Sequence, residues 1–131
     1  AGVATADEVD RLLLIASKWS NCMVVADEIY DGLDFTGHQV SVASRSHNVP
    51  VFSLNGVSKV YYAPGWRIGY MAIHDPQGRM NLVRDGIERM LRSRLCASTP
   101  THLGYLAGLF SDRILMVAYK QQVIDERELC L

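Results

Sequence analysis

The sequence of 131 residues lacks the long apolar runs and the leader segment that mark several protein classes. Its longest apolar stretches, such as Leu12–Ala16 and Ile114–Ala118, are far shorter than the roughly 20 residues of a membrane-spanning helix. No basic start is followed by an apolar stretch, so no secretory signal is visible. Because the chain opens with Ala-Gly-Val and no Met, we expect it to be a processed or truncated product.

Charge of either sign is not in excess, with 13 Lys and Arg against 14 Asp and Glu and a net charge of -1. Nucleic-acid-binding domains usually carry a clear basic surplus, so we expect no nucleic-acid partner, and no membrane partner either. Apolar residues make up 49% of the chain, which is enough for one domain with its own core.

Cysteine is scarce. Cys22, Cys96 and Cys130 lie far apart and form no Cys-x-x-Cys pair, which favours a reduced, cytoplasmic setting over a disulfide framework. The four histidines show no ligand spacing, so we predict no metal site.

Hydrophobic spacing and turn residues divide the chain into helices and strands. Thr5-Ala-Asp-Glu8 is a capping-box pattern that predicts the start of a helix. The predicted elements are a helix at 6–19, strands at 22–29, 49–54 and 68–73, and helices at 81–95, 99–110 and from 113 to the end. The stretch 31–48 is expected to hold little regular structure. This order favours an α/β layered domain with a short, mostly parallel sheet of about three strands and flanking helices.

Four residues that can carry chemistry are predicted to meet at one edge of this sheet. Asp27 ends the first strand, Tyr30 follows it, Lys59 follows the second strand, and Arg67 precedes the third. Ligands of open α/β sheets bind beyond the carboxyl ends of strands. An amine for the aldehyde, a carboxylate for the ring nitrogen, a hydroxyl for the phenolic oxygen and a forked cation for the phosphate match the needs of pyridoxal 5'-phosphate. Taken alone, Lys59 is more simply read as a solvent-facing lysine.

The motifs Ala26-Asp-Glu-Ile-Tyr30, Ser58-Lys59 and Gly65-Trp-Arg-Ile-Gly69, in this order, resemble the class I/II (fold type I) pyridoxal phosphate-dependent aminotransferases. Asn55-Gly-Val-Ser-Lys59 and Leu95-Cys-Ala-Ser-Thr-Pro100 resemble the alanine and tyrosine branch. The resemblance covers nearly the whole chain. It implies a central fragment of the large domain, with 1–112 part of the cofactor-binding domain and 113–131 a helix leading toward an absent small domain.

The resemblance implies a role for each site residue. Lys59 would hold the cofactor as a Schiff base and, once freed, move the substrate's α-proton. Asp27 would pair with the ring nitrogen and Tyr30 with the phenolate oxygen. Arg67 would clamp the phosphate, with Ser58 adding a hydroxyl.

One residue departs from the family pattern, which usually has serine three residues before the lysine, where this chain has Gly56. The phosphate shell is therefore expected to be thinner. Gly2 is interpreted as the tail of the family's Asn-Pro-x-x-Gly segment. Tyr61 and Tyr62 are candidates to line the site or a partner surface, but packing or exposure is favoured. Trp66 is a candidate cation–π partner of Arg67, with core packing as the equal alternative.

The function implied is transfer of an amino group between an amino acid and a 2-oxo acid, by a parent protein that is a cytoplasmic homodimer. The fragment by itself is expected to be inactive. Two alternatives stay open: another class I/II pyridoxal phosphate enzyme (a lyase, decarboxylase or synthase), or a non-catalytic fragment with no cofactor bound. Uncovered apolar faces are expected to cause self-association or domain swapping.

Overall fold

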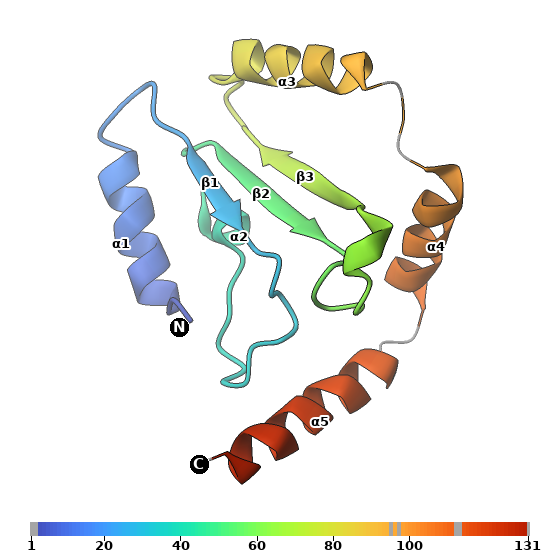
Figure 1. Cartoon of the computed structure of the whole chain (residues 1–131). Helices are drawn as coiled ribbons and strands as arrows, with labels where there is room; N and C mark the ends of the chain where they lie inside the picture. The colour runs from blue at the N-terminus through green and yellow to red at the C-terminus, as the bar shows by residue number, and fades with distance from the viewer. Residues whose placement is uncertain (1–2, 95, 97, 112–113, 131) are drawn as a thin grey trace.

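The computed structural model describes residues 3–94, 96, 98–111 and 114–130. A central sheet is surrounded by helices at several of its edges (Figure 1). In chain order the elements are α1 (Ala6–Ala16), β1 (Val24–Asp27), α2 (Val42–Arg45), β2 (Val51–Gly56), the 3₁₀ turn η1 (Pro64–Trp66), β3 (Gly69–His74), α3 (Asn81–Ser93), α4 (Thr99–Phe110) and α5 (Ile114–Leu129). In the described part of the chain, no helix is both long enough and apolar enough to span a membrane.

The sheet has three strands in the order β1-β2-β3, which confirms the predicted α/β class and strand number. β1 and β2 run parallel, from the pair Val24 and Val51 to the pair Asp27 and Leu54. β3 runs antiparallel to β2, so the sheet is mixed rather than mostly parallel. The reason lies in the connection, because the segment from Val57 to Ile68 returns to the same edge without a crossover helix, and parallel strands need a crossover.

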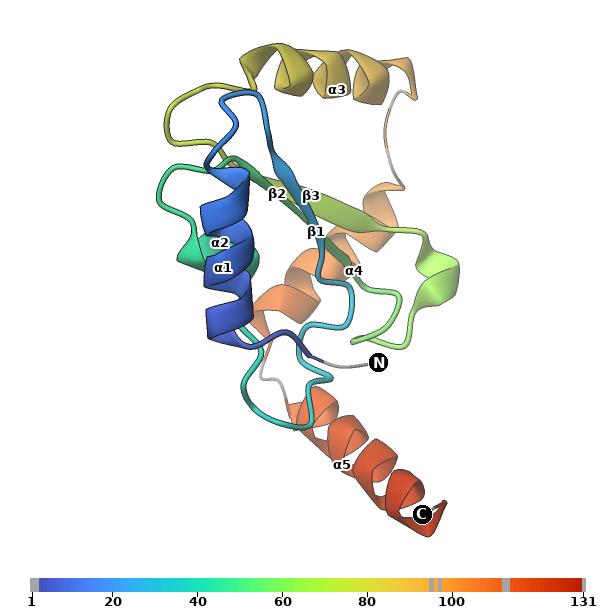
Figure 2. The ribbon, with the colours of Figure 1, turned by 90° about the vertical axis from the view of Figure 1, so that its left-hand side faces the viewer.

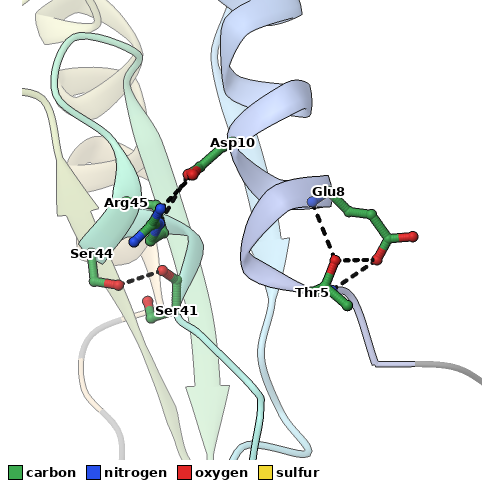
Figure 3. Close-up of polar contacts among 6 residues, drawn as sticks. All are labelled: Thr5, Glu8, Asp10, Ser41, Ser44 and Arg45. Carbon is green, nitrogen blue, oxygen red and sulfur yellow. Dashed lines mark hydrogen bonds and ion pairs between the residues drawn. The ribbon is translucent and has the colours of Figure 1, made fainter.

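The capping box that the sequence predicts is present at the start of α1 (Figure 3). The Glu8 amide donates to Thr5 Oγ1 at 3.3 Å, and the Thr5 amide donates to Glu8 Oε2 at 2.8 Å. The helix ends at Ala16 rather than at the predicted Trp19. Beyond Ala16 the amides of Lys18 and Trp19 donate to carbonyls three residues back, so the chain tightens into turns.

α1 and α2 lie side by side on one face of the sheet (Figure 2). Val9, Leu13 and Ala16 of α1 are buried against strand residues of β1 and β2, which forms the main core. Burial of this apolar surface, at about 25 cal/mol per Å², is the largest favourable contribution to the fold.

The stretch 31–48 is more ordered than the sequence predicts, because it contains α2. Two carboxylates hold this short helix in place. Glu28 accepts a hydrogen bond from the Val42 amide at 2.8 Å. Asp10 accepts one from Arg45 Nε at 2.9 Å, as Figure 3 shows. Neither partner is adjacent in sequence, so local patterning could not have found the helix.

The other element ends agree with the prediction to within a few residues, as is usual for helix and strand termini. Four predicted points lie outside the described residues. They are Gly2, the helix end at Leu95, the helix start at Arg113, and the domain boundary between 112 and 113.

Large apolar side chains remain uncovered over the third strand and the helix that follows it. On β3, Tyr70, Met71 and Ile73 are exposed. α3 buries none of its residues, and its Leu82 is 88% exposed. These faces are apolar surface of the kind that partners or further chain segments cover.

Candidate active site

All five residues predicted for the site lie at one edge of the sheet. The parallel pairing puts Asp27, the last residue of β1, beside Leu54 of β2. The antiparallel pairing puts Gly56, the last residue of β2, beside Gly69, the first of β3. Ser58 and Lys59 therefore leave this edge just where Arg67 returns to it, and Tyr30 leaves it from β1.

Three of the five side chains share one pocket. The Lys59 Nζ lies 5.5 Å from the centroid of the Tyr30 ring, a cation–π distance. Tyr30, Ser58 and Lys59 line an open pocket of about 210 Å³. The remaining lining residues are aromatic or apolar, namely Leu33, Tyr62, Pro64 and Tyr119. The pocket thus offers one amine and several hydroxyl groups against apolar walls.

Asp27 lies at the same edge but is not among the residues that line this pocket. Its side chain is exposed, and Oδ1 accepts the Ile29 amide at 3.2 Å. The next residue, Glu28, donates its amide to the Leu54 carbonyl at 2.9 Å. These bonds fix the exit of the chain from β1 and so fix the direction in which Tyr30 leaves the strand.

Arg67 is also outside the pocket lining, although its hydrogen-bond partner Pro64 is inside it. Its backbone is left-handed, with φ 51° and ψ 44°. The guanidinium turns back and Nη1 donates to the Pro64 carbonyl at 2.9 Å. A guanidinium has five donors in a fork, so this single bond leaves others for an anion.

Gly56 departs from the family pattern for a physical reason. A Cβ built there would lie 2.7 Å from the Ile68 carbonyl oxygen and 3.0 Å from Gly69 Cα. Both are backbone atoms of the neighbouring chain segment, so they cannot rotate away. Any side chain at position 56, serine included, would therefore force the two strands apart at this pair of glycines.

Two further aromatic residues line the pocket: Tyr62, for which the sequence favoured packing or exposure, and Tyr119, which the sequence did not single out. Tyr62 has a left-handed φ of 55°, and its ring meets that of Tyr119 edge-on with centroids 4.2 Å apart. A hydrogen bond with Tyr62 raises the pKa of the Tyr119 hydroxyl to about 12. Tyr119 lies in α5, far along the chain, and no spacing in the sequence links it to Lys59.

An aromatic cluster around the buried Tyr105 lies next to the segment that carries Lys59. Tyr105 of α4 meets Tyr61 edge-on at 5.9 Å and stacks on Tyr70 at 6.1 Å. Burial raises the pKa of Tyr105 to about 12, and burial followed by the charges of Asp31 and Glu28 raises that of Tyr70. Both hydroxyl groups therefore stay protonated to more alkaline pH than the hydroxyl of an ordinary tyrosine.

Comparison with known proteins gives a consistent result. A family model described as aminotransferase class I and II matches residues 1–130. Tyrosine aminotransferase of Caenorhabditis elegans is 34% identical over 87 residues, which are 66% of this chain and 18% of that protein. S-alkyl-thiohydroximate lyase SUR1 of Arabidopsis thaliana is 44% identical over 57 residues, 43% of this chain and 12% of that protein.

Among solved structures, an alanine aminotransferase from Pyrococcus furiosus matches with a TM-score of 0.91 at 36% identity. The match covers 95% of this chain and 32% of that one. The chain therefore spans at most about a third of the length of these relatives.

Proposed function

Because this chain belongs to the class I and II aminotransferase family, we propose that its longer protein transfers an amino group between an amino acid and a 2-oxo acid. The transfer uses pyridoxal phosphate held at Lys59. The observation that carries the proposal is the shared pocket of Tyr30, Ser58 and Lys59 at the sheet edge where β1 and β2 end. Since the chain spans only part of its relatives, the activity is proposed for the longer protein, and we expect the 131 residues alone to turn over very slowly.

The residues present fit this cofactor, which class I and II aminotransferases use. Lys59 supplies the primary amine, and the pocket of about 210 Å³ has apolar walls for a flat ring. Asp27 and Arg67 lie at the same edge, with the carboxylate and the guanidinium that a ring nitrogen and a phosphate require. When bound, the cofactor supplies an electron sink for charge that develops at the substrate's α-carbon.

We assign the following roles to the side chains. Lys59 Nζ would hold the cofactor through its amine and, when free, would accept and return the proton of the substrate's α-carbon. Asp27 would keep the nitrogen of the cofactor ring protonated. The hydroxyl of Tyr30 would donate a hydrogen bond to the phenolic oxygen of that ring. Ser58 and Arg67 bind the phosphate and so fix the ring relative to Lys59.

A lyase is the second candidate, favoured by the similarity to S-alkyl-thiohydroximate lyase SUR1. Removal of the α-proton by Lys59 would begin either reaction. The groups that decide between transfer and bond cleavage are those that hold the rest of the substrate.

We also propose that the longer protein is a cytoplasmic homodimer. The three cysteines, Cys22, Cys96 and Cys130, are free, which agrees with a reducing compartment. The uncovered apolar side chains of β3 and α3 offer surface for association, as in many dimers.

Trapping of the cofactor tests the proposal directly. Pyridoxal phosphate is added to the chain, the adduct is reduced with borohydride, and the modified peptides are mapped. We expect labelling at Lys59 well above that of Lys18 and Lys120, and loss of it in Lys59→Ala. Equal labelling of the three lysines would overturn the role of Lys59. An amino-donor screen on the longer protein then separates transfer from cleavage by its products.

A further inference from the structure

The segment from Val57 to Ile68 carries both Lys59 and Arg67, and its backbone is strained. In the described part of the chain, Tyr62 and Arg67 are the residues other than glycine that have a left-handed φ, at 55° and 51°. Side chains with a Cβ rarely adopt this conformation, and it persists only where the surroundings enforce it. Some neighbouring element must therefore hold this segment in place.

Helix α4 is this element, and two of its glycines contact the segment. Gly104 and Gly108 are one turn apart, so they lie on the same face of the helix. A Cβ at Gly104 would lie 2.7 Å from Cζ3 and 3.1 Å from Cη2 of Trp66. A Cβ at Gly108 would lie 3.3 Å from Cε1 of Tyr61. Two aromatic rings of the segment thus pack directly against the backbone of α4. A side chain at either glycine would prevent such close packing.

Tyr105, which directly follows Gly104, anchors the base of the same segment. Tyr105 is buried together with Val57 and Ile68, the first and last residues of the segment. The Val57 amide donates to the Ile68 carbonyl at 3.3 Å, which closes the loop. The segment is therefore held by α4 at its base and at two points along its length.

Each glycine contacts an aromatic residue that is close in sequence to a different site residue. Gly108 seats Tyr61, two residues after Lys59, and the next amide, of Tyr62, donates to the Lys59 carbonyl at 3.3 Å. Gly104 seats Trp66, which directly precedes Arg67, and the Arg67 guanidinium is bonded to Pro64 of the same turn. A displacement at either glycine is thus passed through one or two residues to the amine or to the guanidinium.

We propose that Gly104 and Gly108 are positioning residues, which set Arg67 and Lys59 respectively through Trp66 and Tyr61. The link to cofactor binding rests on the function proposed above, whereas the link to the segment's conformation does not. The two glycines have different roles. Gly104 determines the position of the Arg67 guanidinium, which contacts the phosphate, and Gly108 determines the position of the Lys59 amine.

Three alanine variants of the chain test the proposal. Gly104→Ala and Gly108→Ala each add a methyl group against an aromatic ring, and Gly86→Ala is the matched control because a Cβ there meets nothing within 4 Å. The first measurement, which involves no cofactor, is hydrogen exchange of the amides of Tyr62 and Trp66, both hydrogen-bonded within the segment. We expect faster exchange in the two α4 variants and none of this change in Gly86→Ala.

The second measurement compares borohydride trapping at Lys59 with pyridoxal phosphate and with pyridoxal, which lacks the phosphate. Gly104→Ala should reduce the preference for the phosphorylated form, and Gly108→Ala should reduce trapping with both. We expect each effect to be roughly tenfold, because a misplacement of about 1 Å at a reacting group can lower rates by up to 10²-fold. Trp66→Phe, with a smaller ring, should restore the preference in Gly104→Ala.

The outcomes separate the two proposals. Exchange and trapping in both α4 variants equal to those of Gly86→Ala would overturn the positioning roles. Faster exchange in these variants with no specific trapping at Lys59 in the unmodified chain would support the positioning of the segment and overturn the cofactor role. If Gly104→Ala does not fold, Trp66→Ala removes the same contact without crowding. Unchanged exchange at the amide of residue 66 in that variant would equally count against the proposal.

Discussion

Replacing Gly56 by the serine common in the family should destabilise the protein rather than improve its phosphate site. The added Cβ would lie 2.7 Å from the Ile68 carbonyl oxygen and 3.0 Å from Gly69 Cα. Ordinary contacts of a Cβ require about 3.4 Å or more, so β2 and β3 must move apart where Gly56 pairs with Gly69. Overpacking of this kind costs about 1–3 kcal/mol. A weakened hydrogen bond between the strands would add about 0.5–1.5 kcal/mol.

We therefore expect Gly56→Ser to lower the free energy of unfolding by about 2–4 kcal/mol, a large part of the 5–15 kcal/mol typical of a domain. Urea unfolding followed by circular dichroism measures this change. Gly65→Ala is the control, because Gly65 is exposed and a Cβ there meets nothing within 4 Å. A Gly56→Ser midpoint equal to that of Gly65→Ala would refute the steric reasoning, and with it the explanation of the missing serine.

Three further predictions concern the cap, the loop and the uncovered faces. Thr5→Ala removes the capping box of α1 and should cost about 0.5–2 kcal/mol in thermal unfolding, whereas Thr99→Ala, at an exposed position, should cost less. Hydrogen bonds from Thr36, then from Gln39 and His38, hold the pKa of Asp34 well below its usual range. This stabilisation is therefore present above the unfolded pKa and is lost as the pH falls toward the lower folded value, and Asp34→Asn should remove that part of the acid sensitivity in urea titrations. The chain should self-associate through β3 and α3, so a monodisperse monomer in concentrated sedimentation runs would contradict this expectation.

Local signals in the sequence were sufficient for much of the fold. The capping box at Thr5 and Glu8 indicated the start of α1, and apolar runs indicated the three strands. Contacts between distant residues accounted for the errors. α2 forms where Glu28 and Asp10 hold it, and β3 is antiparallel because its connection contains no crossover helix.

The candidate site also combines features that local sequence signals predict with features that depend on contacts between distant residues. Tyr30 and Lys59 could be placed together from strand ends, since ligands of such sheets bind where strands end, whereas Ser58 was added by the family resemblance. The inward turn of Arg67 onto Pro64 could not be predicted, because a left-handed arginine has no sequence signature. Tyr119 was out of reach for the same reason, as only tertiary packing brings α5 to the pocket.

The mixed sheet has a consequence for the order of folding. β2 and β3 are joined by a short segment, so their pairing closes a small loop, whereas the β1 pairing must join Val24 to the distant Val51. Loops of low contact order form sooner, so we expect the hairpin that carries Lys59 to form first and β1 to dock afterwards. Tyr30 and Asp27 arrive only with β1, and the pocket is therefore completed late in folding. Pulse-labelling hydrogen exchange should protect the Tyr70–His74 amides before those of β1, and simultaneous protection would contradict this order.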